Sequence, residues 1–116
     1  LSLRLGASGC RLDLSSLPLL DGALTLLSSG IKSSLHDQNR AAVQIDTSDL
    51  NGGADTKFDA HIATLFDPQT SGGLLGVFPR DTANRLVATL HKDGHTAAII
   101  GTLDFTNTGV HLAGNM

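Results

Sequence analysis

The residues best suited to contact a ligand form one segment, Asp67-Pro68-Gln69-Thr70-Ser71-Gly72-Gly73. Its two glycines allow a ligand to approach the backbone closely, and its two hydroxyls can donate hydrogen bonds. The Asp67 carboxylate can accept a hydrogen bond or help to hold a cation. These are parts of an anion or nucleotide contact. The residues that we expect to line a cleft near a nucleotide are Asp67, Gln69, Thr70, Ser71, Gly72 and Gly73.

The same segment also suits a tight turn that delivers a buried strand, and from its chemistry alone the turn is the better interpretation. It is not a P-loop, because it has no Gly-Lys-Ser/Thr and its glycines precede a predicted strand instead of a helix. It also lacks the Gly-x-Gly-x-x-Gly spacing of a dinucleotide-binding fold. The residue types therefore leave both the turn and the binding loop open.

Cys10 is the only cysteine, which excludes an internal disulfide and a multi-cysteine zinc site. It stands between Gly9 and a predicted strand, with no His or Lys beside it. This position favours a small buried residue over a nucleophile. A single unpaired thiol is typical of a reducing compartment, so we expect a cytoplasmic protein.

Two of the five histidines, His91 and His95, are close in sequence. Gly94 should end the helix between them and remove a shared face, so we expect a helix-end cation and a loop residue instead of a metal pair. His36 stands in a polar stretch with Lys32 and Arg40. We expect an ordinary solvated loop there, with a phosphate contact as the alternative.

Three acidic residues have no calcium-loop spacing and are expected on a solvated face; they are Asp46, Asp49 and Asp55. Nothing like Gly-x-Ser-x-Gly is present, which disfavours serine hydrolase chemistry.

The chain has 116 residues, enough for one domain with one core. It carries 11 acidic and 8 basic residues, a net charge of -3, which argues against binding to nucleic acid or to an anionic membrane. The longest apolar tract, residues 12–31, contains Asp13, Pro18 and Asp21 and falls short of a membrane span. Since the sequence begins without methionine and shows no signal peptide, we expect a piece of a longer protein.

Apolar spacing predicts the elements that must position these residues. Helices are expected at residues 19–28, 59–66 and 81–93, and the end of another at residues 1–8. Short strands are expected at residues 11–14, 41–45 and 109–113. Residues 28–40 and 46–57 read as loops, and a turn is expected at Asn107.

Two continuous apolar runs, residues 73–78 and 97–101, have the composition of strands buried on both faces. The clearest helix signal in the chain lies between them. Strand, helix and strand with short connections predict a right-handed βαβ unit with parallel strands at residues 73–103. The predicted fold class is therefore α/β (α+β), with one right-handed βαβ unit.

Residues 65–75, Leu-Phe-Asp-Pro-Gln-Thr-Ser-Gly-Gly-Leu-Leu, resemble the signature near the carboxyl end of selenophosphate synthetase, also called selenide, water dikinase. Further segments resemble the same family in the same order; they are residues 9–14, 17–23, 30–40 and 98–101. The resemblance covers nearly the whole chain. It implies that residues 1–116 are one carboxyl-terminal domain. Its fold would be a layered α/β sandwich with a mixed sheet, similar to the carboxyl-terminal domain of aminoimidazole ribonucleotide synthetase.

The resemblance implies an enzyme that converts selenide, ATP and water to selenophosphate, AMP and phosphate, with Mg²⁺ bridging the nucleotide phosphates. The family's catalytic Cys or selenocysteine and Lys lie near the amino terminus of the full protein, and its metal-binding aspartates lie upstream of this sequence. We therefore expect no catalytic residue, metal ligand or bound cofactor in this chain, and no activity from it alone. The implied partners are the amino-terminal domain of the same polypeptide and a second copy of the full enzyme.

Two alternatives stay open. The same domain could serve another ATP-dependent member of the superfamily, such as a purine-biosynthesis or thiamine-phosphate kinase relative. It could also be a non-catalytic module fused to an oxidoreductase. An Asp-Val-Thr-Gly-Phe-Gly stretch upstream, and a glycine-rich segment with Cys or selenocysteine still earlier, would favour the synthetase.

Overall fold

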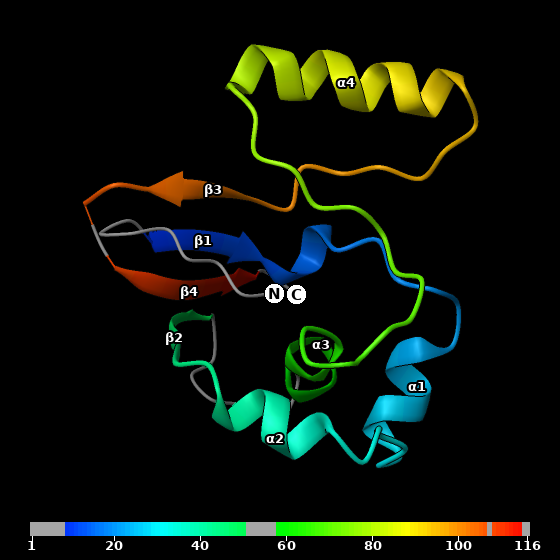
Figure 1. Ribbon diagram of the computed structural model, residues 1–116, viewed down its shortest axis with the longest axis vertical. Coiled ribbons are helices and arrows are strands. Elements are labelled where there is room, and N and C mark those ends of the chain that lie inside the picture. The colour runs from blue at the N-terminus through cyan, green and yellow to red at the C-terminus, as the bar shows by residue number, and fades with distance from the viewer. Residues whose placement is uncertain (1–8, 51–57, 107, 115–116) are drawn as a thin grey trace.

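Four strands form one mixed sheet in the computed structural model, which describes residues 9–50, 58–106 and 108–114 (Figure 1). The strands are β1 (Gly9–Asp13), β2 (Ile45–Leu50), β3 (Gly101–Asp104) and β4 (Gly109–Gly114). Their order across the sheet is β2-β4-β1-β3. β4 runs parallel to both β2 and β1, and β3 is antiparallel to β1. The mixed sheet predicted from the sequence is therefore confirmed.

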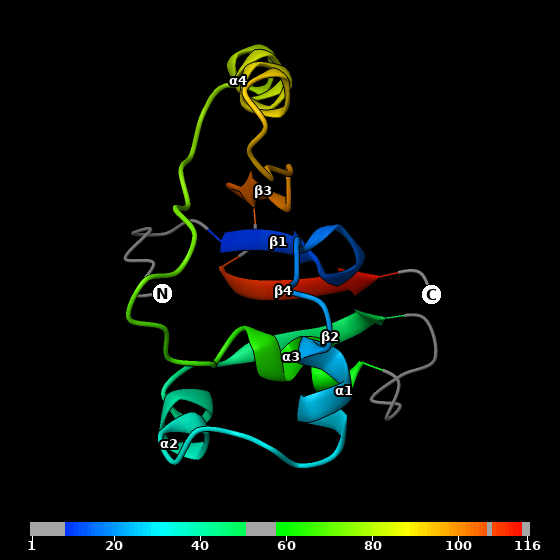
Figure 2. The same cartoon turned by 90° about the vertical axis from the view of Figure 1, so that its right-hand side faces the viewer.

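Within the described residues, four α-helices and one 3-10 helix accompany the sheet. They are the 3-10 helix η1 (Leu14–Ser16) and α1 (Ala23–Ser28), α2 (His36–Ala41), α3 (Asp59–Thr64) and α4 (Arg80–Lys92). α1, α2 and α3 gather at the β2 end of the sheet, whereas α4 lies beyond β3 at the opposite end (Figures 1 and 2). None of the helices that the structure describes has the length and hydropathy needed to span a bilayer.

The core lies between the sheet and α3. Leu14, Leu50, Phe58 and Leu112 form its buried centre. Side chains from β1, β2, β4 and α3, and from the residues that follow η1 and α3, pack around that centre at partial burial; they are Leu12, Leu17, Ile45, Ile62, Leu65 and Val110. The sheet thus buries one face against a helix, as expected for a layered α+β domain.

Local sequence explains where several elements end. Asp13 caps η1, because its carboxylate accepts a hydrogen bond from the Ser15 backbone N–H at 3.0 Å. Gly94 has φ +81° and ends α4 with a left-handed residue, as predicted. The helices at residues 19–28 and 59–66 and the strand at residues 109–113 are also confirmed, with slightly different limits.

The strand predicted at residues 73–78 is wrong. These residues form no strand in the structure and are all exposed, with Leu74 at 105% and Val77 at 60%. A strand buried on both faces needs a partner strand and a layer on each side. β2 and β3 are the edge strands of the sheet, but residues 73–78 pair with neither of them. The predicted βαβ unit therefore does not form, although its helix, α4, does.

The strand predicted at residues 97–101 is displaced to β3, which begins at Gly101. β3 pairs with β1 only as far as Gly101 and Leu12, because the chain turns into η1 after Asp13. The Ile100 carbonyl still accepts a hydrogen bond from the Asp13 N–H at 2.9 Å. The pairing partner, not the apolar composition, sets the limits of this strand.

Two loops predicted from the sequence contain regular structure. Residues 36–41 form α2, and residues 45–50 form β2 in place of the strand expected at residues 41–45. β2 contains the irregularity expected of a polar edge strand, a register shift between Asp46 and Asp49. The expectations for residues 1–8, residues 51–57 and Asn107 lie outside the described residues.

Candidate functional site

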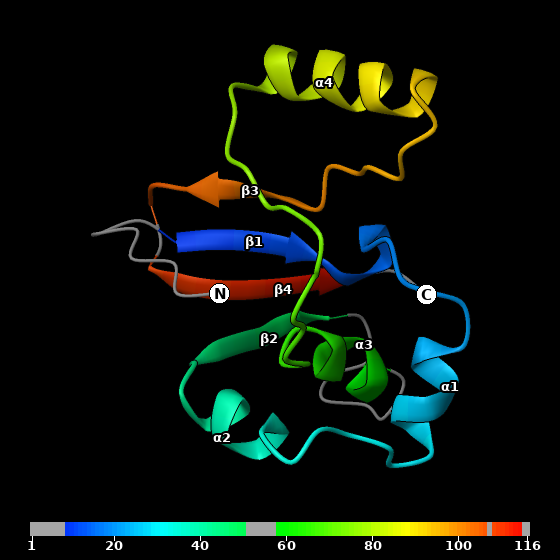
Figure 3. The same ribbon diagram turned by 45° about the vertical axis from the view of Figure 1, so that its right-hand side comes forward.

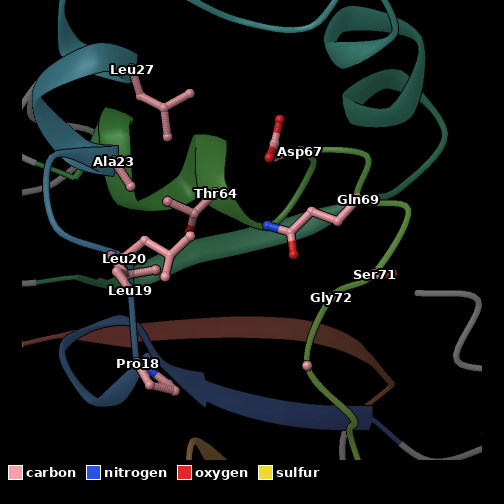
Figure 4. Close-up of a pocket in the computed structure, with 11 residues that line it drawn as sticks. Pro18, Leu19, Leu20, Ala23, Leu27, Thr64, Asp67, Gln69, Ser71 and Gly72 are labelled. Atoms are coloured by element: carbon pink, nitrogen blue, oxygen red, sulfur yellow. The ribbon is translucent and has the colours of Figure 1, made fainter. Parts of the chain in front are cut away.

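A hollow of about 330 Å³ lies between the segment at residues 67–73 and the start of α1 (Figure 4). One wall is apolar and belongs to α1 and the loop before it; it consists of Pro18, Leu19, Leu20, Ala23 and Leu27. The other wall is polar and glycine-rich; it consists of Thr64, Asp67, Gln69, Ser71, Gly72 and Gly73. Five of the six predicted cleft residues therefore line one hollow.

The end of α3 positions the polar wall. The Asp67 N–H donates to the Thr64 carbonyl at 3.4 Å, which closes the last turn of the helix. Pro68 follows and prevents further helix, since it disfavours helical geometry at the preceding residue. The Asn39 side-chain amide donates to the Phe66 carbonyl at 3.1 Å and ties this turn to α2. The segment thus leaves the helix at a fixed point.

Phe66, the last buried residue before the segment, is held by two side chains of α2. His36 meets its ring edge-on, with centroids 6.2 Å apart, and the Arg40 guanidinium lies over the ring at 5.3 Å. His36 is buried, with 7% of its surface exposed. The prediction that His36 stands in a solvated loop is therefore wrong, and its ring packs on Phe66 instead of joining Lys32 and Arg40 around a phosphate.

The hollow has little charge of its own, because Asp67 is its single ionisable residue. Figure 4 shows the Gln69 side chain reaching from the loop toward Thr64 and Leu20. The Gln69 amide oxygen also lies close to Gly72, where an added Cβ would meet it at 2.8 Å. Thr70 does not line the hollow. A ligand here would meet one carboxylate, one amide, the Ser71 and Thr64 hydroxyls, glycine backbone and an apolar wall.

A magnesium ion does not fit the described residues without outside ligands. Mg²⁺ prefers six oxygen ligands, usually one or two carboxylates together with phosphates and waters. The hollow supplies only the Asp67 carboxylate, and no group of three metal-binding side chains occurs in the described part of the chain. Asp67 can contribute one ligand at most, so we derive no reaction step through a metal.

A second polar group lies on the sheet, away from the hollow. His111 Nδ1 of β4 lies 3.2 Å from the Asp46 carboxylate of β2, and Arg11 of β1 forms an ion pair with Asp49 of β2. The Ser48 backbone N–H, which donates to Asp46, is the main cause that lowers the pKa of that carboxyl. Asp46 and Asp49 are thus exposed, as expected, but they pair across strands.

Cys10 is buried, with 4% of its surface exposed, as its sequence context predicted. Desolvation raises the pKa of its thiol above the usual value. A thiol is nucleophilic as the thiolate, so this environment suits packing and not catalysis. His91 lies in the last turn of α4, where its Nε2 contacts the Ala97 carbonyl at 2.7 Å, and Gly94 separates it from His95.

Comparison with known proteins gives a consistent set of relatives. A selenide, water dikinase of Geobacter sp. (strain M21) is 31% identical over 94 residues, which are 81% of this chain and 25% of that protein. A selenide, water dikinase of Pseudomonas straminea is 34% identical over 95 residues, 81% of this chain and 26% of that protein. The chain is homologous to the selenide, water dikinases. It spans about a quarter of the length of the curated relatives that it matches.

The dikinase match includes most of the hollow. A match over 94 residues of a 116-residue chain contains residues 23–94 wherever it begins, and so contains the segment at residues 67–73. No family model matches the chain, and no solved structure matches it significantly.

Sequence reasoning missed the residues that complete the site. Pro18 was predicted to end a strand and residues 19–28 to form a helix. Nothing in these patterns indicated that this wall faces residues 67–73. Asn39 and Thr64 were not singled out, because an amide donor to a distant carbonyl and a hydroxyl in a helix have no local sequence signature. The two walls were linked in the sequence only because both lie in segments that resemble the dikinases.

Proposed function

We propose that this chain is the carboxyl-terminal domain of a selenide, water dikinase, which forms selenophosphate, AMP and phosphate from selenide, ATP and water. The observation that carries the proposal is the dikinase match through residues 23–94, which contains the Asp-Pro-Gln-Thr-Ser-Gly-Gly segment and most of the hollow. In this role the hollow is one wall of a cleft whose reactive groups and metal ligands lie on the rest of the polypeptide.

The residues that line the hollow are suited to contact a nucleotide and not to catalyse its reaction. Ser71 and the Gly72 and Gly73 backbone can donate hydrogen bonds to an anion, and the Leu20 and Leu27 side chains can exclude water from one side. No basic residue lines the hollow, so charge neutralisation of phosphates must come from elsewhere. The chain alone is therefore proposed to be inactive.

The proposal includes a homodimeric full-length enzyme and a cytoplasmic location. A reducing compartment keeps a lone thiol such as Cys10 reduced. ATP and Mg²⁺ are the proposed cofactors of the complete protein, and Asp67 supplies the carboxylate that lines the hollow.

Adjacent hydroxyls provide a matched test in the complete enzyme. Ser71 lines the hollow and Thr70 does not. Ser71→Ala should raise the KM for ATP about tenfold, the effect of removing one hydrogen bond to a charged group, while Thr70→Ala should change it less than about twofold. Selenophosphate formation is followed by ³¹P nuclear magnetic resonance. Equal effects of the two substitutions, or no effect of either, would contradict the assigned contact.

A further inference from the structure

Residues 72–100 form an arm that leaves the body of the domain, and we call this segment the apolar arm. It consists of an extended segment, α4 and a second extended segment that returns to β3 (Figure 3). α4 lies apart from the other helices in all three ribbon views. The arm is therefore connected to the domain by its two extended segments.

The extended segments carry exposed apolar side chains. Residues 73–79 contain no charged or hydrogen-bonding side chain, only Gly, Leu, Val, Phe and Pro. The exposed fractions are 105% for Leu74, 60% for Val77 and 48% for Phe78. Ile99, on the returning segment, is 45% exposed. Surface loops are normally polar, and a concentration of exposed apolar side chains marks a surface that another body covers.

A second copy of the chain is a poor candidate for that body. α4 has 13 residues and is about 20 Å long. The extended segment at residues 73–79 adds only a short stretch of chain to the surface that a second copy could contact. A symmetric contact of this size would bury well under the roughly 1,600 Å² of a standard stable interface.

The length of the relatives indicates a better candidate. The matched segment is 25% of the Geobacter dikinase, so three quarters of such a polypeptide lies outside it. A surface on the same polypeptide is present at a high effective concentration, so a small apolar contact is enough to hold it. The arm also lies at the end of the sheet opposite α1, α2 and α3, where no described helix covers the sheet (Figure 1).

We propose that the apolar arm is a docking surface for the remainder of the dikinase polypeptide, which covers Leu74, Val77 and Phe78. This inference rests on the proposed function. It assigns an interface role to residues 74–78 of the arm, which follow directly after Gly72 and Gly73 of the hollow.

A chimera tests the inference. The matched 94-residue segment of the Geobacter sp. (strain M21) dikinase is replaced by the corresponding residues of this chain, which include residues 23–94. Hydrogen exchange of the amides at residues 74–78 is then measured in the chimera and in the isolated chain. We expect exchange to be about tenfold slower or more in the chimera.

Two substitutions at matched exposure serve as probe and control. Val77 is 60% exposed on the arm, and Ile31 is 61% exposed on the loop between α1 and α2. Val77→Asp should abolish the slow exchange at residues 74–78 in the chimera, and Ile31→Asp should leave it. Exchange at β4, next to the buried Leu112, identifies a variant that has simply unfolded.

Equally fast exchange in the chimera and the isolated chain would overturn the inference. Protection of the isolated chain that increases with its concentration would also overturn it, in favour of a second copy. Selenophosphate formation by the chimera is measured separately. A protected but inactive chimera would contradict the proposed function and leave the docking surface standing, whereas an active chimera with an exposed arm would do the reverse.

Discussion

Asp13 shows how one side chain can end one element and begin the next. Asp13 is the last residue of β1, and its carboxylate accepts hydrogen bonds from the Ser15 hydroxyl, the Ser16 hydroxyl and the Ser15 backbone N–H. The Ser15 hydroxyl is the main cause that lowers the pKa of Asp13 below its usual value. The folded protein therefore holds this carboxyl in its charged form.

This lowered pKa predicts a loss of stability in acid. The unfolded chain takes up the proton near pH 3.9, above the pKa of folded Asp13, so falling pH favours unfolding. The free energy of unfolding should decrease as pH falls from about 5 through the lowered pKa, and less steeply in Asp13→Asn. Urea unfolding at each pH measures it.

Ser15→Ala removes the largest cause of the shift and should reduce the same dependence. A slope that is unchanged in both variants would show that Asp13 does not titrate differently in the folded chain.

Two glycines should respond very differently to the same substitution. A Cβ on Gly101 would fall on the Arg11 carbonyl oxygen and lie 3.1 Å from the Leu12 Cα, both backbone atoms of the paired strand. Gly101→Ala should therefore lower the free energy of unfolding by about 1–3 kcal/mol. Gly73→Ala meets nothing within 4 Å and should change it by less than about 0.5 kcal/mol.

Urea unfolding measures both glycine variants. Equal losses would mean that β3 does not pair with β1 at this register.

At the scale of elements, the sequence predicted those whose signals are local. α4 has an apolar stripe and a glycine stop, and α3 ends before Pro68; both helices form where expected. α2 was missed because its residues, His-Asp-Gln-Asn-Arg-Ala, have no apolar period. It is stabilised through Asn39 and Arg40, which contact Phe66 some 26 residues away, and no local pattern contains that information.

The strand predicted at residues 73–78 failed for a different reason. Apolar composition shows that a segment is suited to burial, but it does not show that the segment will pair with another strand or be covered by other layers. Pairing is a property of the assembled sheet. Gly109–Gly114 is less apolar and contains His111, yet it forms a strand, because β1 and β2 lie on either side of it.

The same leucine-to-alanine substitution should have a large effect on stability in the central strand β4 and a small one in the arm. Leu112 of β4 has 0% of its surface exposed, whereas Leu74 is fully exposed. Leu112→Ala should lower the free energy of unfolding by about 2–5 kcal/mol through cavity formation. Leu74→Ala should change it by less than about 0.5 kcal/mol. Chemical denaturation gives both values, and a large loss for Leu74→Ala would show that the arm packs on the domain.

At the scale of the whole molecule, one of the two walls of the candidate site could be predicted from the sequence. The polar wall at residues 67–73 was found from its residue types and from its resemblance to the dikinases. The apolar wall, some 45 residues earlier, faces it only because α1 packs against α3. Packing between helices depends on the complete chain, so sequence patterns alone did not bring these two walls together.

The arm should also determine where a protease first cuts the isolated chain. Thermolysin cleaves before large apolar residues, and Leu74, Leu75, Val77 and Phe78 are all exposed on extended chain. We expect the first cuts at residues 73–78, identified by mass spectrometry. Phe58 and Phe66, at 2% and 7% exposure, serve as internal controls. Earlier cleavage at either phenylalanine would contradict the described core.

The position of β4 has a consequence for how this domain is made. β4 is the last described strand in the chain, yet it lies between β1 and β2, which pair with it and not with each other. A ribosome must therefore synthesise the final strand before the parallel part of the sheet can form at all. Until then β1 and β2 have no parallel partner, and closing the sheet requires contacts distant in sequence, which fold slowly. The nascent chain should depend on chaperones for longer than its size suggests.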